Sequence, residues 1–387
     1  MHDVAIIGGG IGGLTAALAF QTKGAQVTVY EQAPVLSEVG AGLQITPNGM
    51  RVLKALGLED ALVAESVAAQ AVVPMDGLIG RAVTRFDLSR KDPRYRFVHR
   101  AALIRVLDEA CQQAGIDVVL GARIEDVGSD GRFDGRFHVD GVLKSPDLTV
   151  GADGLHSVVR PLLNGPGKPF FTHQVAWRAV VEMEAPPEAR IWMLPGAHVV
   201  TYPLSGGHLN IVAVQERDAW AEEGWHHDDV PANLTSAFAS SCLELREILG
   251  LVENVKLWGL FRHPVADTWG DEGIALLGDA AHPTLPFLAQ GANLAIEDAY
   301  VLAECCAAGD LAAGLQRYQS LRKARVGKAI ATANANAVNY HLRGARRTAS
   351  HLILKGIGAV APDAFINRLS WLYDHDVTAA SSRLPRA

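Results

Sequence analysis

Residues 4–13 have the sequence Val4-Ala5-Ile6-Ile7-Gly8-Gly9-Gly10-Ile11-Gly12-Gly13, and this stretch decides the fold. The apolar residues 4–7 have the length of a buried parallel strand. Gly8, Gly10 and Gly13 follow with the G-x-G-x-x-G spacing, which permits a tight turn, close approach of a pyrophosphate and close packing of a helix on the strand. The helix expected from Ile11 to Lys23 would present its first N–H groups to the phosphates.

A second strand is expected from Gln26 to Tyr30, and it ends at Glu31. An acidic residue about 20 residues beyond the glycines accepts hydroxyl groups of a ribose in dinucleotide-binding folds. Strand, glycines, helix, strand and acid therefore predict an adenine dinucleotide. These elements do not separate FAD from NAD.

A second signature lies far along the chain. Residues 273–277 are an apolar run typical of a buried strand, and Gly278-Asp279 follows at its C-terminal end, where ligands of doubly wound sheets bind. Residues 290–306 have apolar side chains at helical spacing, so Gly291-Ala292-Asn293 should begin a helix whose N–H groups face an electron-rich group. Asp279 is then placed to accept a ribityl hydroxyl.

Residues 278–299, GDAAHPTLPFLAQGANLAIEDA, resemble the FAD-ribityl motif of single-component, FAD-dependent aromatic hydroxylases. Residues 151–160 are similar to the DG motif of that family, and His99 to Leu103 is similar to its Arg-Ala-x-Leu helix start. Residues 40–48 resemble the loop beside the flavin. Trp371 to Asp374 resembles the ending of the branch that contains salicylate hydroxylase, 3-hydroxybenzoate 6-hydroxylase and 6-hydroxynicotinate 3-monooxygenase. The resemblance extends over about residues 3 to 376.

The resemblance implies an α/β fold like that of p-hydroxybenzoate hydroxylase, with a discontinuous Rossmann-like FAD domain and an interleaved β-sheet substrate domain. NAD(P)H would reduce FAD, and the reduced flavin would react with O2 to give a C4a-hydroperoxide that hydroxylates the substrate. Asp153 would serve both nucleotides, and Arg160 would serve NAD(P)H. The residues assigned to FAD are Gly8, Gly10, Gly12, Gly13, Glu31, Gln32, Leu43, Arg100, Asp153, Asp279, Gly291, Ala292 and Asn293.

His198 is the best candidate for the base that removes the proton of a phenolic substrate. Residues four apart on a strand share a face, so His198 and Tyr202 should lie on one side. This spacing resembles the substrate-facing pair of 3-hydroxybenzoate 6-hydroxylase and 6-hydroxynicotinate 3-monooxygenase. An imidazole has an unperturbed pKa of about 6.5 and can accept a proton near neutral pH. The alternative is a polar histidine at the rim, without a catalytic role.

Gln44 and Pro286 are assigned to the substrate pocket, with Pro286 lining it through its carbonyl group. The 3-hydroxybenzoate branch has a glutamine at the position of Pro286, so its substrate does not transfer directly. His282 lies inside the FAD motif, where a structural role is more common than catalysis. His226-His227-Asp228-Asp229 is expected to be a solvated loop, because adjacent histidines seldom converge on one metal ion.

The motifs divide the chain into interleaved parts. Residues 1–70, 96–165 and 265–305 should form the FAD domain, and residues 70–95 and 166–264 the substrate domain. In the second group, β-type segments at 174–181, 189–193, 199–204 and 210–215 are separated by Pro and Gly. Residues 306–376 should form C-terminal helices, over 311–336 and 345–372, and residues 377–387 a disordered tail.

Composition excludes several classes of protein. The 387 residues are 49% hydrophobic, enough for two interlocked domains, and a net charge of −7 without a long basic run argues against nucleic acid. Apolar runs stay below the ~18 residues of a membrane span. The four cysteines form no C-x-x-C pair and are expected to be reduced. We expect a cytoplasmic monomer or homodimer without a metal ion.

These observations predict an FAD-dependent monooxygenase that uses NAD(P)H and O2 to hydroxylate a monocyclic phenolic aromatic or heteroaromatic acid. The alternatives are a ubiquinone-type ring hydroxylase, which would show a prenyl-sized apolar channel, and a non-hydroxylating FAD redox protein. A flavin-dependent halogenase is disfavoured because the sequence has no W-x-W-x-I-P segment.

Overall fold

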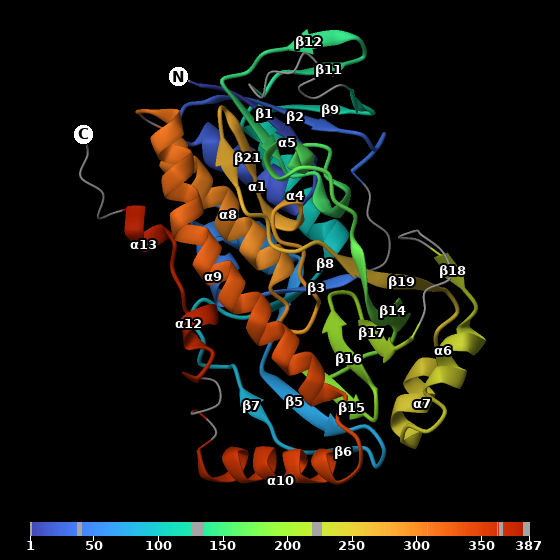
Figure 1. Cartoon of the computed structure of the whole chain (residues 1–387). Coiled ribbons are helices and arrows are strands. Elements are labelled where there is room, and N and C mark those ends of the chain that lie inside the picture. The colour runs from blue at the N-terminus through green and yellow to red at the C-terminus, as the bar shows by residue number, and fades with distance from the viewer. Residues whose placement is uncertain are drawn as a thin grey trace.

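The computed structural model describes residues 2–36, 41–125, 135–218, 227–307, 309–361, 363 and 367–381. A six-stranded sheet forms the first layer, with the strand order β20-β21-β13-β1-β2-β9 (Figure 1). Five of its strands are parallel, and β20 is antiparallel to β21. The strands are β1 (Asp3–Ile7), β2 (Gln26–Glu31), β9 (Asp117–Leu120), β13 (Leu148–Gly151), β20 (Gly270–Asp271) and β21 (Ile274–Leu276).

The helix that follows the glycines lies in the centre of this layer. Helix α1 (Ile11–Gln21) is buried on nearly every side, because α4 (Arg100–Gln113) and α8 (Gly291–Cys306) pack against it. The strand–glycine–helix–strand order predicted from the sequence is confirmed. The remaining elements of this half are α2 (Pro47–Ala55), α3 (Glu59–Ala64), β10 (Ile124–Glu125), β11 (Phe137–Val139), β12 (Val142–Lys144), η1 (Gly154–His156), α5 (Arg160–Asn164) and η2 (Gly278–Ala280).

A nine-stranded sheet forms the second half, with the order β18-β19-β14-β17-β16-β15-β5-β6 and β7 paired to β5. Its strands are β5 (Ala71–Asp76), β6 (Arg81–Ala82), β7 (Phe86–Asp87), β14 (Phe170–Glu182), β15 (Glu188–Leu194), β16 (Ala197–Leu204), β17 (His208–Glu216), β18 (His227–Asp229) and β19 (Val255–Arg262). The four β-type segments of the sequence are therefore strands β14 to β17, each a few residues longer than predicted. A three-stranded sheet of β3 (Gly42–Ile45), β8 (Arg96–His99) and β4 (Ser66–Ala68) lies between the two halves (Figure 1).

Alternation along the strands of the large sheet separates a core face from a functional face. On one face Trp177, Trp192 and Val199 are fully buried, and they belong to one apolar cluster with residues of α6 (Pro231–Ala237) and α7 (Leu243–Gly250). The residues between them, among them Arg178 and His198, project from the opposite face, toward the first half of the molecule.

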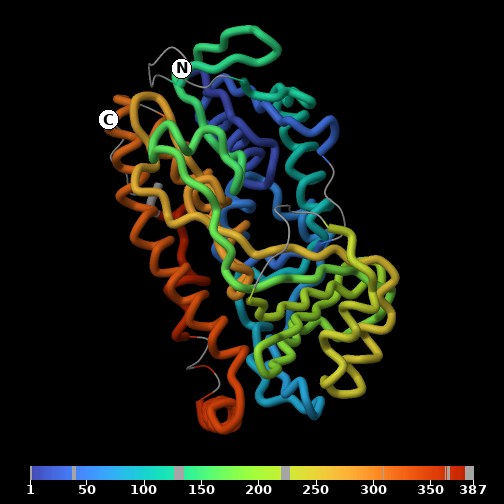
Figure 2. The backbone as a smooth tube through the Cα atoms, turned by 45° about the vertical axis from the view of Figure 1, so that its right-hand side comes forward, coloured from blue at the N-terminus to red at the C-terminus, as the bar shows by residue number. Residues whose placement is uncertain are grey.

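The C-terminal part joins both halves. Helix α9 (Leu311–Tyr340) runs along the whole length of the molecule, and α10 (Gly344–Val360) crosses its lower end, where Figure 2 shows it nearly end-on. The helix expected over 345–372 is interrupted: α10 ends at Val360, and the short helix α12 (Ser370–Tyr373) follows. Ala361 precedes a proline and has φ −148° and ψ 64°, since a proline disfavours helical conformation in the residue before it.

The tail that was expected to be disordered is partly ordered. Residues 378–381 form the helical turn α13 (Thr378–Ser381), which contacts α2. Asp376 begins this turn, because its carboxylate accepts the backbone N–H of Thr378 at 2.9 Å. Residues 382–387 lie outside the described residues. No helix of the described chain is both long enough and apolar enough to cross a membrane.

Candidate active site

A cavity of about 620 Å³ lies at the C-terminal ends of β1, β2 and β13, between the sheet and α8. Most residues assigned to the cofactor line it, although they come from segments far apart in the sequence. They are Gly8, Gly10, Gly12, Glu31, Gln32, Leu43, Arg100, Asp153, Asp279, Gly291 and Ala292. Gly13 and Asn293 do not line it.

The glycines of the first turn differ in what surrounds them. Gly8 has φ +106°, and a Cβ there would lie 2.5 Å from the carbonyl oxygen of Ala152. A Cβ on Gly13 would lie 1.9 Å from the carbonyl oxygen of Gly8, so this position serves the close packing of α1 on the turn. A Cβ on Gly10 would meet no protein atom within 4 Å. The open space at Gly10 is therefore on the cavity side, where a ligand can approach the backbone.

Glu31 is fixed at the edge of the cavity by the backbone. Its two carboxylate oxygens accept the N–H groups of Gly9 at 2.7 Å and of Ala33 at 2.8 Å. Each carboxylate oxygen can accept a further hydrogen bond. Glu31 is thus oriented and still able to bind a hydroxyl group.

Two arginines and one aspartate place charge on the cavity wall. Burial raises the pKa of Asp279 and lowers the pKa of Arg100 to about 10. Arg178 also lines the cavity, beside the ring of Trp258 at 5.2 Å, and burial lowers its pKa. Its Nε has no hydrogen-bond partner in the described part of the chain. Arg100 and Arg178 therefore offer two cationic groups to a ligand beside Asp279, while Arg123, Glu31 and Asp153 line other parts of the cavity.

Arg178 was not among the site residues predicted from the sequence. It is the one charged residue of the apolar segment from Val175 to Val181 in β14. A charged side chain between strongly apolar neighbours on a central strand needs a partner, and that pattern could have identified it.

Arg160 has different partners from those expected. Its guanidinium donates to the carbonyl oxygens of Ala280 at 2.8 Å, Ala281 at 3.1 Å and Pro264 at 2.7 Å. It does not line the cavity. In the structure, Arg160 therefore connects the DG segment to the backbone of η2, whereas Asp153 remains on the cavity wall.

Asn293 has a bridging position behind the cavity. Its side-chain oxygen accepts the N–H of Thr46 at 3.0 Å, and its amide donates to the carbonyl groups of Gln44 at 2.9 Å and Ala289 at 2.6 Å. Its amide oxygen and its amide N–H groups therefore all bind backbone groups of the protein. Asn293 thus positions the segments that line the cavity.

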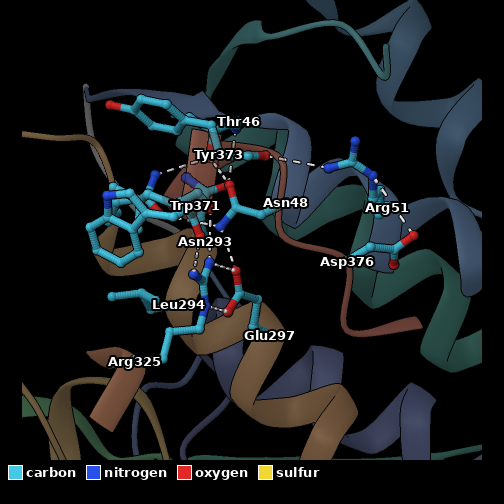
Figure 3. Close-up of polar contacts among 12 residues, drawn as sticks. Thr46, Asn48, Arg51, Asn293, Leu294, Glu297, Arg325, Trp371, Tyr373 and Asp376 are labelled. Atoms are coloured by element: carbon cyan, nitrogen blue, oxygen red, sulfur yellow. Dashed lines mark hydrogen bonds and ion pairs between the residues drawn. The ribbon is translucent and has the colours of Figure 1, made fainter. Parts of the chain in front are cut away.

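A polar network extends this bridge to the C-terminal part (Figure 3). Asn48 donates to the carboxylate of Glu297 at 2.6 Å, and Arg325 binds the same carboxylate at 2.7 and 2.8 Å. Arg325 also donates to the carbonyl oxygen of Trp371 at 2.8 Å. Burial alone would raise the pKa of Glu297, but the charges of Arg322 and Arg325 bring it below its ordinary value. The network fixes α2, α8, α9 and α12 relative to one another.

A second cavity, of about 570 Å³, lies on the functional face of the large sheet. It is lined by His198 and Val200 of β16, by neighbouring strands, by the end of α9 and by α10. Gln44, Pro286 and Ala289 line both cavities. The two cavities therefore meet at Gln44 and Pro286, the two residues that the sequence assigned to the substrate pocket.

His198 is enclosed, with only 1% of its surface exposed. The rings of Phe287 and Tyr340 lie 5.4 and 5.3 Å from its imidazole, measured between ring centres. Its Nδ1 lies 2.7 Å from Nε2 of His341. Burial and the neighbouring His341 hold the pKa of His198 well below its usual value. The imidazole is therefore neutral near neutral pH and able to accept a proton.

Tyr202 is on the same face as His198 but does not line the second cavity. Its ring stacks on Phe97 at 5.0 Å, and a Cβ on Gly42 would lie 2.8 Å from it. Burial raises the pKa of Tyr202. Tyr202 therefore supports β3, next to Gln44.

His282 has the structural position favoured by the sequence. It is fully buried, stacks on Trp269 and bonds Asp298 through Nε2 at 2.5 Å. His227 to Asp229 forms edge strand β18, and His226 lies outside the described residues. Among the residues that the structure describes, no group of three or more His, Cys, Asp or Glu side chains could hold a metal ion.

The first cavity fits FAD, the cofactor that the resemblance implies. The open space at Gly10 and the N-terminus of α1 suit a pyrophosphate. Glu31 suits the ribose, and Asp279 suits the ribityl chain. The first residues of α8, Gly291 and Ala292, line the cavity where their N–H groups would meet the electron-rich edge of a flavin ring.

Comparison with known proteins agrees with this geometry. Residues 1–333 match the model of the family described as FAD binding domain. The chain is 36% identical to the 3-amino-4-hydroxybenzoate 2-monooxygenase PtmB3 of Streptomyces platensis, over 88% of each chain. It is 33% identical to 3-hydroxybenzoate 6-hydroxylase 1 of Aquipseudomonas alcaligenes, over 96% of this chain and 98% of that one. The crystal structure of Klebsiella pneumoniae HpxO with FAD and uric acid superposes with a TM-score of 0.81, 27% identity and 95% coverage of both chains.

Proposed function

The chain belongs to the FAD binding domain family and is an FAD-dependent monooxygenase, and we propose that it hydroxylates a monocyclic phenolic aromatic or heteroaromatic acid. The family, the fold and the enzyme class predicted from the sequence are confirmed. The bound flavin supplies the activated oxygen. The proposed co-substrates are NAD(P)H and O2.

The observation that carries the proposal is the position of His198 in an apolar cavity that joins the cofactor cavity. A phenolate ring carbon is much more electron-rich than that of a phenol, so removal of the hydroxyl proton activates the substrate. Nδ1 of His198 is occupied by His341, which leaves Nε2 for the substrate hydroxyl. Phe287 and Tyr340 hold the imidazole in place and exclude water.

The charges on the cavity wall support an acidic substrate. Lys91, Arg346 and Arg368 line the second cavity, and no Asp or Glu side chain of the described residues does. Lys91 is paired with Asp374 at 2.8 Å. Arg346 and Arg368 are therefore proposed to attract the carboxylate while the ring occupies the apolar part beside Gln44 and Pro286.

A ubiquinone-type ring hydroxylase is the second candidate, because the cavity is large and partly apolar. Ile353, Leu354 and Ile357 of α10 extend its wall away from His198. A substrate with an apolar substituent would bury that substituent there. The 33–36% identity to enzymes of hydroxybenzoates favours the acid.

The test is a panel of phenolic acids, their methyl esters and prenylated phenols, offered with NADH or NADPH. We expect at least one free acid to stimulate NAD(P)H oxidation and to give nearly one hydroxylated product per NAD(P)H. The matching ester should bind more weakly. Oxidation without any hydroxylated product would contradict the proposal, and turnover of prenylated phenols alone would favour the second candidate.

A further inference from the structure

Three polar side chains form a continuous line from the second cavity to the protein surface. Nδ1 of His198 lies 2.7 Å from Nε2 of His341, and Nδ1 of His341 lies 3.0 Å from Oε1 of Glu216. The exposed fraction rises along this line, from 1% at His198 and 4% at His341 to 38% at the side chain of Glu216. The line thus begins at the proposed substrate and ends in solvent.

We propose that His341 and Glu216 are a proton relay, which transfers the hydroxyl proton of the substrate from His198 to solvent and returns it later in the cycle. The inference rests on the proposed function, because it needs a substrate with an ionisable hydroxyl group at His198. It assigns positioning and proton-transfer roles to two residues outside the substrate cavity.

With one set of tautomers, each hydrogen bond of the line is donated in the direction from the substrate toward solvent. Neutral His198 accepts the substrate proton at Nε2 and donates its Nδ1 proton to Nε2 of His341. His341 then passes its own Nδ1 proton to the carboxylate of Glu216, which releases it to water. When oxygen transfer is complete, the product oxygen needs a proton as the ring carbon loses one. The same line run backwards supplies it and restores the starting tautomers, so no proton is gained or lost along the relay.

The surroundings of His198 make a relay necessary. Tyr340 and His341 face it from the end of α9 and Phe287 from the loop before α8, and its neighbours in register are Met193 on β15 and Val214 on β17. None of these carries a negative charge, so a proton left on His198 would have only the substrate phenolate as its counter-charge, and this ion pair would favour return of the proton to the substrate. His341, by contrast, has Glu216 beside it. Burial lowers the pKa of both histidines, and Glu216 opposes that shift at His341.

The turn between β15 and β16 holds the relay together. Gly196 has φ +73°, donates its N–H to the carbonyl oxygen of His341 at 3.0 Å, and accepts the N–H of Glu216 at 3.0 Å. Arg343 occupies the place where a side chain at Gly196 would lie and binds Oε2 of Glu216 at 2.7 Å. The other oxygen, Oε1, is left to His341. One turn therefore aligns the relay residues, although they come from different elements.

Proton release on substrate binding tests the relay directly. The FAD-loaded enzyme is mixed with a phenolic substrate in weakly buffered solution that contains a pH indicator. For the unaltered enzyme we expect a rapid release of protons. In His341→Gln and Glu216→Gln, which keep hydrogen-bonding side chains, we expect release to be slower by roughly 10²-fold, the lower range for a positioned proton-transfer group. FAD content and affinity for a methoxy analogue of the substrate should not change.

Two matched variants control for loss of a histidine or a carboxylate elsewhere. His351→Gln removes a histidine that pairs with Asp76 at 3.2 Å, and Glu188→Gln removes a carboxylate that pairs with Arg85 at 3.0 Å. Both should release protons at the normal rate. In the relay variants the loss in the rate of hydroxylation should also fade as pH rises toward the substrate's own pKa of about 10, because the substrate then arrives ionised and has no hydroxyl proton to transfer. A defect due to altered structure would persist at all pH values.

Normal proton release in both relay variants would overturn the inference, as would a defect that is independent of pH. Either result would leave the proposed function intact, provided that the unaltered enzyme hydroxylates a phenolic acid. If the unaltered enzyme hydroxylates none, the proposed function fails first. Partial recovery of Glu216→Ala by added acetate would support the relay, since a small carboxylate can take the place of the missing one.

Discussion

The side-chain oxygen of Asn293 accepts the backbone N–H of Thr46 at 3.0 Å, across 247 residues of sequence. This bond connects the first turn of α8 to the end of strand β3, which carries Leu43 into the first cavity and Gln44 into both cavities. A Cβ on Gly49 would lie 2.2 Å from the same oxygen, so α2 also packs closely against it. The wall of the cofactor cavity is therefore positioned by a residue that does not line it.

Replacement of Asn293 should weaken FAD binding without a contact to FAD. Asn293→Ala leaves the buried N–H of Thr46 without its acceptor, at a cost of about 1–3 kcal/mol. If about half of that cost falls on β3 and Thr46, the Kd for FAD should rise about two- to tenfold, as measured by titration of the apoprotein. Asn233→Ala, whose amide bonds Asp229 on the far side of the large sheet, should leave the Kd unchanged. A normal Kd in Asn293→Ala would show that the loop keeps its position without the bridge.

Two glycines of the first turn should respond differently to substitution. Gly10→Val should fold but be isolated without FAD, because its side chain extends into space free of protein atoms and meets the pyrophosphate. Gly13→Ala should lower the melting temperature of the apoprotein, since its Cβ would overlap the carbonyl oxygen of Gly8. Circular dichroism melting and flavin content together separate these effects. Full flavin occupancy in Gly10→Val would contradict the assignment of Gly10.

Removal of His198 should impair hydroxylation far more than flavin reduction. Burial and His341 lower the pKa of His198, so in the unaltered enzyme this base stays neutral down to well below pH 6.5. Protonation of His198 should therefore not reduce hydroxylation between pH 8 and 6.5. His198→Ala should lose roughly 10²–10⁴-fold and release more hydrogen peroxide. The loss should shrink as pH approaches the phenol's pKa of about 10. Product formed per NAD(P)H across this pH range is the measurement, and normal coupling at neutral pH would show that His198 is not the base.

Neutralisation of Arg178 should make the bound flavin harder to reduce. The reduced flavin carries more negative charge than the oxidised form, and a hydrogen bond to a charged group contributes about 1.5–3 kcal/mol. For a two-electron couple this corresponds to a fall of about 30–60 mV in the midpoint potential of Arg178→Gln. The matched control is Arg190→Gln. Arg190 is a cation of strand β15 in the same sheet, and it is paired with Glu244 of α7. An unchanged potential in Arg178→Gln would place its charge away from the flavin ring.

The cofactor half could be predicted because its signals are local. Glycine spacing, an acid at a strand end and apolar runs each specify the backbone within a few residues, and the structure brings Gly8, Glu31, Arg100 and Asp279 to one cavity. Strands β14 to β17 of the second sheet were also predictable, from β-type composition interrupted by Pro and Gly. The pairing of β16 with β15 and β17 determines the face of the sheet from which His198 projects.

The sequence did not predict how longer side chains choose their partners. Arg160 has five N–H donors, and it takes three carbonyl oxygens near η2 because they are the acceptors within reach. Asn293 lies within the cofactor motif, yet in the folded chain its amide group binds the backbone of Thr46 and Gln44. His341 lies 143 residues from His198, and only the docking of α9 against the turn at Gly196 makes them neighbours. No pattern of neighbouring residues in the sequence identifies such long-range contacts.

The family match ends at residue 333, whereas the wall of the second cavity continues through Asn336, Tyr340 and the residues of α10. One side of the second cavity therefore comes from a C-terminal segment beyond the family match, while strands β5, β15 and β16 line the cavity from within the matched range. A graft of residues 342–373 from a relative would therefore exchange one side of the substrate cavity, and it would have to keep the carbonyl contacts of Arg325 with Trp371 and Leu372, which connect this segment through Glu297 to α8.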